Sequence, residues 1–181
     1  GFMIVEAVGG VLSGSLALLA DAGHMLTDAA ALALAYAAFR FGRRPADSKR
    51  TFGYLRFEVI AGFLNAVTLF VIVAWIAYEA WERLQAPPVI LAGPMMIVAV
   101  LGLLVNVLVL WIMTRGETDH VNVKGAILHV MGDLLGSVGA IVAAVVIYLI
   151  GWTPIDPILS VLVAALILRS AWKLLAKSIH I

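Results

Sequence analysis

Two pairs of ionisable side chains stand out in the sequence, because each consists of a histidine and an aspartate four residues later. His24 and Asp28 lie in the stretch HMLTD, and His129 and Asp133 lie in HVMGD. On a helix, residues four apart project from the same face, so each pair would offer an imidazole nitrogen and a carboxylate to one neighbour. Zinc is bound in proteins by such ligands in tetrahedral geometry. The four side chains are therefore candidate ligands of a divalent metal.

The composition indicates that these pairs belong to an integral membrane protein. Hydrophobic residues make up 64% of the 181 residues and charged residues 13%, and the mean hydropathy is +1.08. A soluble domain is usually about half apolar and about one quarter charged, so this chain has too little polar surface for water. The absence of cysteine excludes disulfides. We recognise no signal peptide, and the net charge of +1 gives no reason to expect a nucleic-acid partner.

Apolar runs long enough to cross a lipid bilayer predict an all-α, six-helix transmembrane bundle. Ser13-Gly14-Ser15 divides the first run, and Pro87-Pro88 ends the third helix. The predicted helices span about 1–12, 16–39, 57–84, 91–113, 121–150 and 156–177, in a single transmembrane domain over residues 1–181. The first helix would be only ~18 Å long at 1.5 Å per residue, so we expect it to be N-terminally truncated.

The basic residues predict the orientation of the bundle. Every lysine and arginine except Arg83 lies in or beside the connections after the second and fourth helices, or near the end of the sixth. By the positive-inside rule, this end of the bundle is cytoplasmic. Because the number of helices is even, both termini are then expected in the cytoplasm.

Both His–Asp pairs are expected near the bilayer centre, because each begins about eight residues into its helix. The second and fifth helices run in opposite directions, so antiparallel pairing would set His24 level with Asp133 and Asp28 level with His129. Buried charges at this depth are costly, but two carboxylates would neutralise a divalent cation. Imidazole ligands favour zinc, cobalt, nickel or copper over magnesium and calcium.

Two other functions would use the same residues. The pairs would act as hydrogen-bonded couples between helices in a structural or channel-like bundle. Alternatively, they would bind the metal of a membrane metalloenzyme, although the chain has no H-E-x-x-H motif with a separate general base. Two pairs at matching depth favour an ion site over structural couples. We therefore expect neither an enzyme nor a cofactor.

Three stretches resemble the cation diffusion facilitator family, and most of all its bacterial zinc, cobalt and cadmium resistance branch: GGVLSGSLALLADAGHMLTD, TFGYLRFEVIAGFLNA and HVMGDLLGSVGAIVAA. The resemblance covers nearly the whole chain. It implies that His24, Asp28, His129 and Asp133 bind the transported ion, and that a homodimer in the bacterial inner membrane exports divalent metal in exchange for protons. Histidine at position 24 matches the family's pattern for zinc preference, so Zn²⁺ is the expected ion, with Co²⁺ or Cd²⁺ as alternatives.

The chain departs from the family pattern beyond the bundle and in its loops. Relatives usually continue after the sixth helix into a cytoplasmic domain that binds metal and helps dimerisation; this chain ends at Ile181, so we expect that domain to be absent. Some relatives also carry metal-binding histidines in their loops. Here the loop after the second helix offers only Asp47, and we interpret Glu117, Asp119 and His120 after the fourth as a solvated polar loop.

Proton exchange follows from the chemistry of the candidate ligands. An unperturbed imidazole has a pKa of about 6.5, and metal binding requires neutral imidazole and ionised carboxylate. A divalent ion and protons therefore compete for one site. If that site opens to each side of the membrane in turn, proton entry drives metal exit.

Of the nine acidic residues outside the two pairs, three have an expected role within the bundle. Asp21, one turn from His24, is interpreted as a waypoint on the exit path or as a partner of a ligand histidine. Glu6 is expected either to face the pathway or to pair within the bundle. Asp156 is expected to cap the sixth helix, which begins beside it. Asn106 is expected to form an interhelical hydrogen bond.

Overall fold

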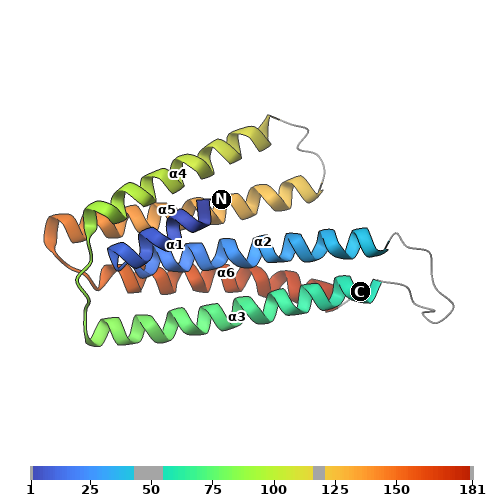
Figure 1. Ribbon diagram of the computed structural model, residues 1–181, viewed down its shortest axis with the longest axis horizontal. Coiled ribbons are helices and arrows are strands. Elements are labelled where there is room, and N and C mark those ends of the chain that lie inside the picture. Colours follow the sequence, from blue (N-terminus) through green and yellow to red (C-terminus); the bar gives the residue numbers. More distant parts are fainter. Residues whose placement is uncertain (1, 43–54, 116–120, 180–181) are drawn as a thin grey trace.

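The computed structural model describes residues 2–42, 55–115 and 121–179, and these residues form six helices and no strand (Figure 1). The helices are α1 Phe2–Ser13, α2 Leu16–Gly42, α3 Leu55–Gln85, α4 Ala92–Thr114, α5 Val121–Ile150 and α6 Ile155–Ile179. Side chains are described over a smaller part, which leaves out residues 1, 31, 35, 37–66, 116–126, 128–129 and 170–181. The all-α, six-helix prediction is confirmed, whereas the loop residues Asp47, Glu117, Asp119 and His120 lie outside the described part.

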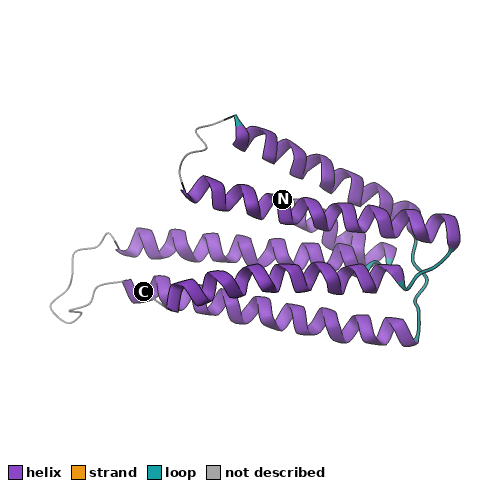
Figure 2. Ribbon diagram, turned by 180° about the vertical axis from the view of Figure 1, so that it is seen from behind, coloured by secondary structure: helices purple, strands orange, loops and turns teal. Residues whose placement is uncertain are grey.

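The five long helices run roughly along one axis, and the short α1 lies against them (Figures 1 and 2). α5 packs against α4 and α6, α2 packs against α1 and α3, and α3 also packs against α6. α2 additionally contacts α5 and α6, so it connects α1 and α3 with α5 and α6. The connections α1–α2, α3–α4 and α5–α6 all lie at one end, which we refer to as the turn end.

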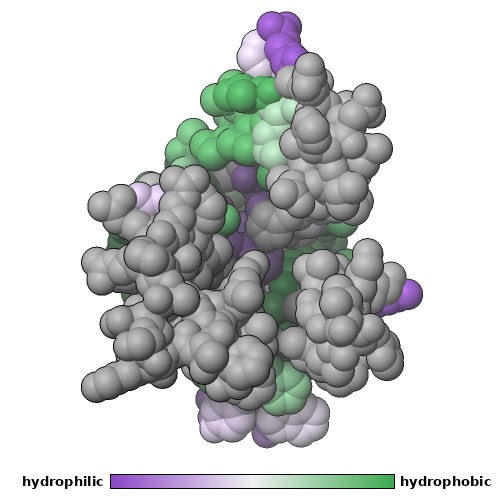
Figure 3. Space-filling view, turned by 90° about the vertical axis from the view of Figure 1, so that its right-hand side faces the viewer, coloured by the Kyte–Doolittle hydropathy of each residue, from purple (hydrophilic) through white to green (hydrophobic). Residues whose placement is uncertain are grey.

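The surface of the bundle is suited to lipid. Three stretches among the described residues are long and apolar enough to cross a membrane: Leu16–Leu34, Ala92–Thr114 and Val130–Ile150. Large apolar side chains such as Leu12, Leu104 and Tyr148 are exposed on the outside of the helices. Seen end-on from the side opposite the turn end, hydrophilic residues lie in the depth between the helices, with hydrophobic residues beside them (Figure 3). This arrangement, apolar outside and polar inside, is typical of a membrane protein with an internal ion path.

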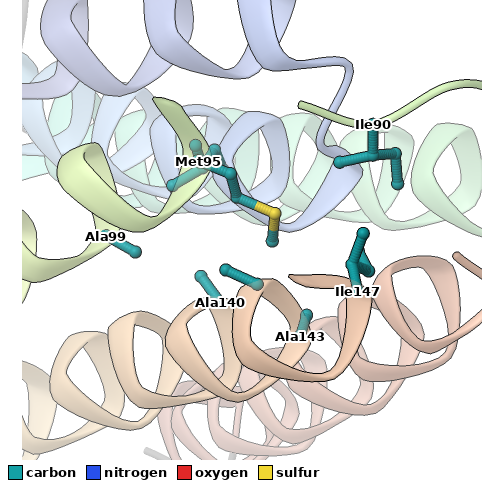
Figure 4. Packing of buried hydrophobic residues seen from close by; sticks show 8 residues of the cluster. Ile90, Met95, Ala99, Ala140, Ala143 and Ile147 are labelled. Atoms are coloured by element: carbon teal, nitrogen blue, oxygen red, sulfur yellow. The ribbon is translucent and has the colours of Figure 1, made fainter. Parts of the chain in front are cut away.

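Small side chains allow the helices that carry the candidate ligands to pack closely. One buried cluster connects α2, the α3–α4 connection, α4 and α5 (Figure 4): Leu18, Ile90, Met95, Ala99, Ala140, Ala143, Ala144 and Ile147. A second cluster joins α2, α3 and α6: Leu16, Ala20, Ile76, Ala80 and Ala164. α2 belongs to both clusters, so its position is fixed from two sides.

Gly14 makes the tight turn between α1 and α2. Its φ of +75° lies in the left-handed region, which glycine adopts without the steric cost that other residues meet. A Cβ at Gly14 would lie 3.0 Å from the carbonyl oxygen of Val89. The backbone N–H of Leu91 also donates to the carbonyl of Ser13 at 2.8 Å. The α3–α4 connection therefore packs directly on this turn and leaves no room for a side chain.

Gly14→Ala is expected to destabilise the fold by about 1–2 kcal/mol, the cost of holding an L-residue in the left-handed region, with a further cost for displacing Val89. Gly93→Ala is the matched control, since a Cβ at this helical position meets nothing within 4 Å and alanine favours helix. The measurement is the midpoint of thermal unfolding of both variants in detergent. Equal midpoints would show that the turn tolerates a side chain.

The prediction that Asp156 caps its own helix is wrong, because its carboxylate caps α2 instead. Asp156 Oδ2 accepts a hydrogen bond from the backbone N–H of Leu16 at 2.7 Å, and Oδ1 accepts from the N–H of Ala17 at 3.2 Å and from the Ser15 hydroxyl at 2.7 Å. These N–H groups belong to the first turn of α2, where no intrahelical acceptor exists. The cap is thus formed across 140 residues of sequence, which local patterns do not reveal.

Arg83 of α3 joins this contact at the turn end. Its Nη1 donates to the carbonyl oxygen of Gly14 at 2.5 Å and lies 4.0 Å from Asp156 Oδ2, while its Nε donates to Glu79 at 2.9 Å. The Arg83 side chain is 14% exposed and that of Asp156 is fully buried. We refer to Gly14, Ser15, Arg83 and Asp156 as the turn-end clasp, which ties the start of α2 to α3 and α6.

Candidate metal site

α2 presents His24 and Asp28 on one face, as expected from their spacing. The Nε2 atom of His24 lies 3.5 Å from Oδ2 of Asp28. Between them, the Thr27 hydroxyl donates to the carbonyl of His24 at 2.7 Å, so this polar group is satisfied by its own helix. The side chain of His24 is 11% exposed and that of Asp28 is 28% exposed. The histidine is therefore held in the interior, and the aspartate lies at its edge.

α5 brings Asp133 to the same histidine. Oδ1 of Asp133 lies 3.6 Å from His24 Nε2, and its side chain is 11% exposed. Ligand atoms of His24, Asp28 and Asp133 all lie within 4.8 Å of one another. His24 and Asp133 thus meet at the same level, which is the arrangement expected for antiparallel α2 and α5.

His129 stays a prediction as the fourth member of the site. Its backbone belongs to α5, one turn before Asp133, and its side chain lies outside the described part. Residues four apart on a helix project from one face, so the expectation that His129 accompanies Asp133 is unchanged.

The distances among the three described side chains suit a bound divalent ion. N–H···O hydrogen bonds usually measure about 2.7–3.2 Å, whereas His24 Nε2 lies 3.5 and 3.6 Å from the two carboxylate oxygens. Two ligand atoms that each lie about 2.0–2.1 Å from a tetrahedral zinc ion are about 3.3–3.4 Å apart. Side-chain movements of a few tenths of an ångström would therefore let all three side chains contact one ion.

Other polar side chains are buried close to this group. Glu6 is 1% exposed and Asp21 is 5% exposed. Nδ2 of Asn106 donates to Oγ of Ser137 at 3.2 Å, which confirms the expected interhelical bond and connects α4 to α5. The sequence alone assigned no role to Ser137, because a single serine on an apolar helix carries no signal of its partner.

The sequence pattern of the cation efflux transmembrane domain matches residues 1–181. The chain belongs to the cation diffusion facilitator family. It is 58% identical over 181 residues to the zinc transporter ZitB of Escherichia coli (strain K12), a match that covers 99% of this chain and 58% of the relative. It is 48% identical over 183 residues to the "Cadmium, cobalt and zinc/H(+)-K(+) antiporter" of Bacillus subtilis (strain 168), which covers 100% and 59%.

A third relative is the "Metal cation efflux system protein CzcD" of Cupriavidus metallidurans, 48% identical over 180 residues, with 99% of this chain and 57% of the relative covered. The chain spans a little under three fifths of the length of these curated family members. Each of the three names describes a transport or efflux protein rather than an enzyme. Family membership and the apolar helices identify a multi-pass protein of the bacterial inner membrane.

Proposed function

We propose that this protein exports divalent metal from the cytoplasm in exchange for protons, with Zn²⁺ as its preferred ion. His24 and Asp28 on α2 and His129 and Asp133 on α5 are the proposed tetrahedral ligands. The observation that carries this proposal is the approach of Asp28 and Asp133 to the same nitrogen of His24, at 3.5 and 3.6 Å. Two carboxylates balance the charge of a divalent ion in an interior of low dielectric constant.

The ligand types support zinc as the ion. Imidazole and carboxylate together suit zinc and cobalt, whereas magnesium and calcium prefer an all-oxygen shell. Relatives whose names specify an ion include zinc transporters and a cadmium, cobalt and zinc antiporter. We therefore propose that Co²⁺ and Cd²⁺ are secondary substrates of the same site.

Proton exchange is proposed to occur at the ligands themselves. Zinc binds neutral imidazole and ionised carboxylate, so its arrival displaces protons and protons displace it. His24 and Asp133 are each 11% exposed, so most of each side chain is shielded from bulk solvent. The coupling then depends on exposing the site to one side of the membrane at a time.

Alternating access is proposed to arise from movement of α2 and α5 relative to α3 and α6, in a homodimer whose termini are cytoplasmic. In this orientation the turn end faces away from the cytoplasm. α2 contacts α3, α5 and α6, so a shift of α2 changes the access to both His24 and Asp28.

The distances weigh against purely structural His–Asp couples. His24 Nε2 lies 3.5 and 3.6 Å from the two carboxylate oxygens, a spacing that fits two ligands of one zinc ion better than a short N–H···O bond. A hydrolytic zinc site normally adds a separate general base. The two acidic residues nearest in sequence to His24 are Asp28, a proposed ligand, and Asp21, which is 5% exposed.

Proton coupling is tested by zinc uptake into proteoliposomes that contain a zinc-sensitive dye, with the membrane potential clamped by valinomycin and potassium. An acidic lumen should drive uptake through molecules whose cytoplasmic side faces outward. For each proton exchanged, the equilibrium zinc ratio should rise about tenfold per pH unit, so the slope gives the stoichiometry. Zinc uptake that is unaffected when nigericin dissipates the gradient would contradict coupling.

A further inference from the structure

Glu6 of α1 and Asp21 of α2 form a second pair of buried carboxylates, separate from the His24 group. Both are almost fully buried, at 1% and 5% exposure. Asp21 precedes His24 by one turn of α2, toward the turn end. Glu6 lies about two helical turns before Ser13, the last residue of α1. It is therefore roughly 10 Å along the helix from the turn between α1 and α2. The pair therefore lies between the candidate zinc site and the turn end.

The two carboxylates lie beside two glycines on neighbouring helices, Asp21 beside Gly136 of α5 and Glu6 beside Gly102 of α4. Oδ1 of Asp21 lies 3.3 Å from the position that a Cβ of Gly136 would occupy. Oε1 of Glu6 lies 2.9 Å from the corresponding position at Gly102 of α4, and Oγ of Ser137 lies 3.4 Å from that same position. A Cβ at Gly102 would be too close to the Glu6 carboxylate, and a Cβ at Gly136 would press on that of Asp21. The glycines thus provide the space in which oxygen atoms from α1, α2 and α5 converge.

Among the described residues, the charged groups that act on this pair are acidic. Oε2 of Glu6 is buried and has no hydrogen-bond partner among the described residues. The charges that act most strongly on Asp21 are those of Glu6, Asp133 and Asp28, all of them acidic. A divalent ion bound by Asp28 and Asp133 neutralises only those two carboxylates. An isolated carboxylate in an apolar interior is very unfavourable, so each member of the pair is neutralised either by a proton or by a cation that displaces it.

We propose that Glu6 and Asp21 form a second binding site for a divalent cation, which the ion occupies between the His24 site and the turn end. This inference deepens the proposed function and rests on it for the direction of transport. The available ligands are two carboxylates, the Ser137 hydroxyl and water, without imidazole. An all-oxygen set binds zinc or cadmium more weakly than a set that includes histidine. A weaker site on the exit side suits release, because a tightly held ion would leave slowly.

The test is a count of Cd²⁺ ions bound to the purified full chain by equilibrium dialysis. The wild type should bind two ions per chain, the second about tenfold or more weakly since its ligands are oxygens. Glu6→Gln should abolish binding of the weakly bound Cd²⁺ ion and keep the tightly bound one. Asp28→Ala should abolish tight binding and keep the weakly bound ion. Glu82→Gln is the matched control, because this exposed glutamate accepts a hydrogen bond from Tyr78 at the surface and should leave both classes intact.

The same experiment separates the two proposals. If Asp28→Ala abolishes tight binding but the wild type holds only a single ion, the second site is wrong and the proposed function stands. If Asp28→Ala leaves tight binding unchanged, the proposed function itself fails. X-ray absorption of Asp28→Ala loaded with one equivalent of zinc provides an independent readout. The weakened His24 site is then nearly empty, so the bound ion should have oxygen neighbours only. Imidazole scattering from that ion would overturn the assignment to Glu6 and Asp21.

Discussion

Asp28→Ala should lower zinc affinity roughly 100-fold and reduce zinc efflux to background. Structural zinc sites with four ligands bind with about 10–16 kcal/mol, so one ligand accounts for about 3 kcal/mol, and each 1.4 kcal/mol is tenfold in affinity. The change also removes one of the two charges that balance the ion. Asp133→Ala should have a similar effect, because Asp133 lies at nearly the same distance from His24. Calorimetric zinc titration of the purified variants measures the affinity.

The alternative of a structural bundle makes the opposite prediction for Asp28→Ala. If the His–Asp pairs only join helices, the wild type binds no zinc tightly and the variant loses stability alone. Thermal unfolding without metal should therefore accompany the titration. Because the Asp28 side chain is 28% exposed, we expect a small change in the unfolding midpoint. A large loss of stability with unchanged zinc affinity would refute the proposed site.

The local sequence predicted those parts of the site that depend on helical spacing. His24 and Asp28 share a face of α2 because they are four residues apart, and Asp133 reaches them because α5 runs antiparallel to α2 at matching depth. Gly14 ended the first helix as expected, since a glycine between two serines interrupts an apolar run. Each of these features follows from the order of residues along one or two helices.

Features that depend on several helices at once were beyond the sequence. Asp156 was assigned to the helix in which it lies, whereas its carboxylate caps α2. Aspartate does prefer helix N-termini, as the prediction assumed, but the helix that Asp156 caps is α2 and not α6. Tertiary packing decides which N–H groups come within reach of the carboxylate. In the same way, Gly102 and Gly136 gain significance only from the carboxylates of Glu6 and Asp21 that pack against them.

The turn-end clasp connects this packing to the metal site. Asp156 and Arg83 hold the first turn of α2, and His24 follows two turns later on the same helix. A helix fixed at one end transmits its position along its length, since consecutive turns are joined by backbone hydrogen bonds. We therefore expect the clasp, together with the two buried clusters, to contribute to where His24 and Asp28 lie relative to Asp133.

Asp156→Ala should destabilise the protein by about 3 kcal/mol, because it removes three buried hydrogen bonds to a charged acceptor and the cap of α2. The same change removes the carboxylate 4.0 Å from the Arg83 guanidinium, which keeps its contacts with Glu79 and Gly14. For a chain of this size, such a loss corresponds to a fall of about 6–12 °C in the unfolding midpoint. Differential scanning fluorimetry of the detergent-solubilised variant measures it.

The control for Asp156→Ala is Glu82→Ala, which removes an exposed carboxylate near the same end of the bundle and should shift the midpoint by less than about 2 °C. The unfolding midpoint of Asp156→Asn should lie between those of the two alanine variants. An amide retains one acceptor oxygen but turns its NH2 group toward a backbone donor. If Asp156→Ala unfolds at the wild-type temperature, α2 does not depend on the clasp. If it unfolds earlier and also binds zinc more weakly, the turn end positions the ligands as well as stabilising the fold.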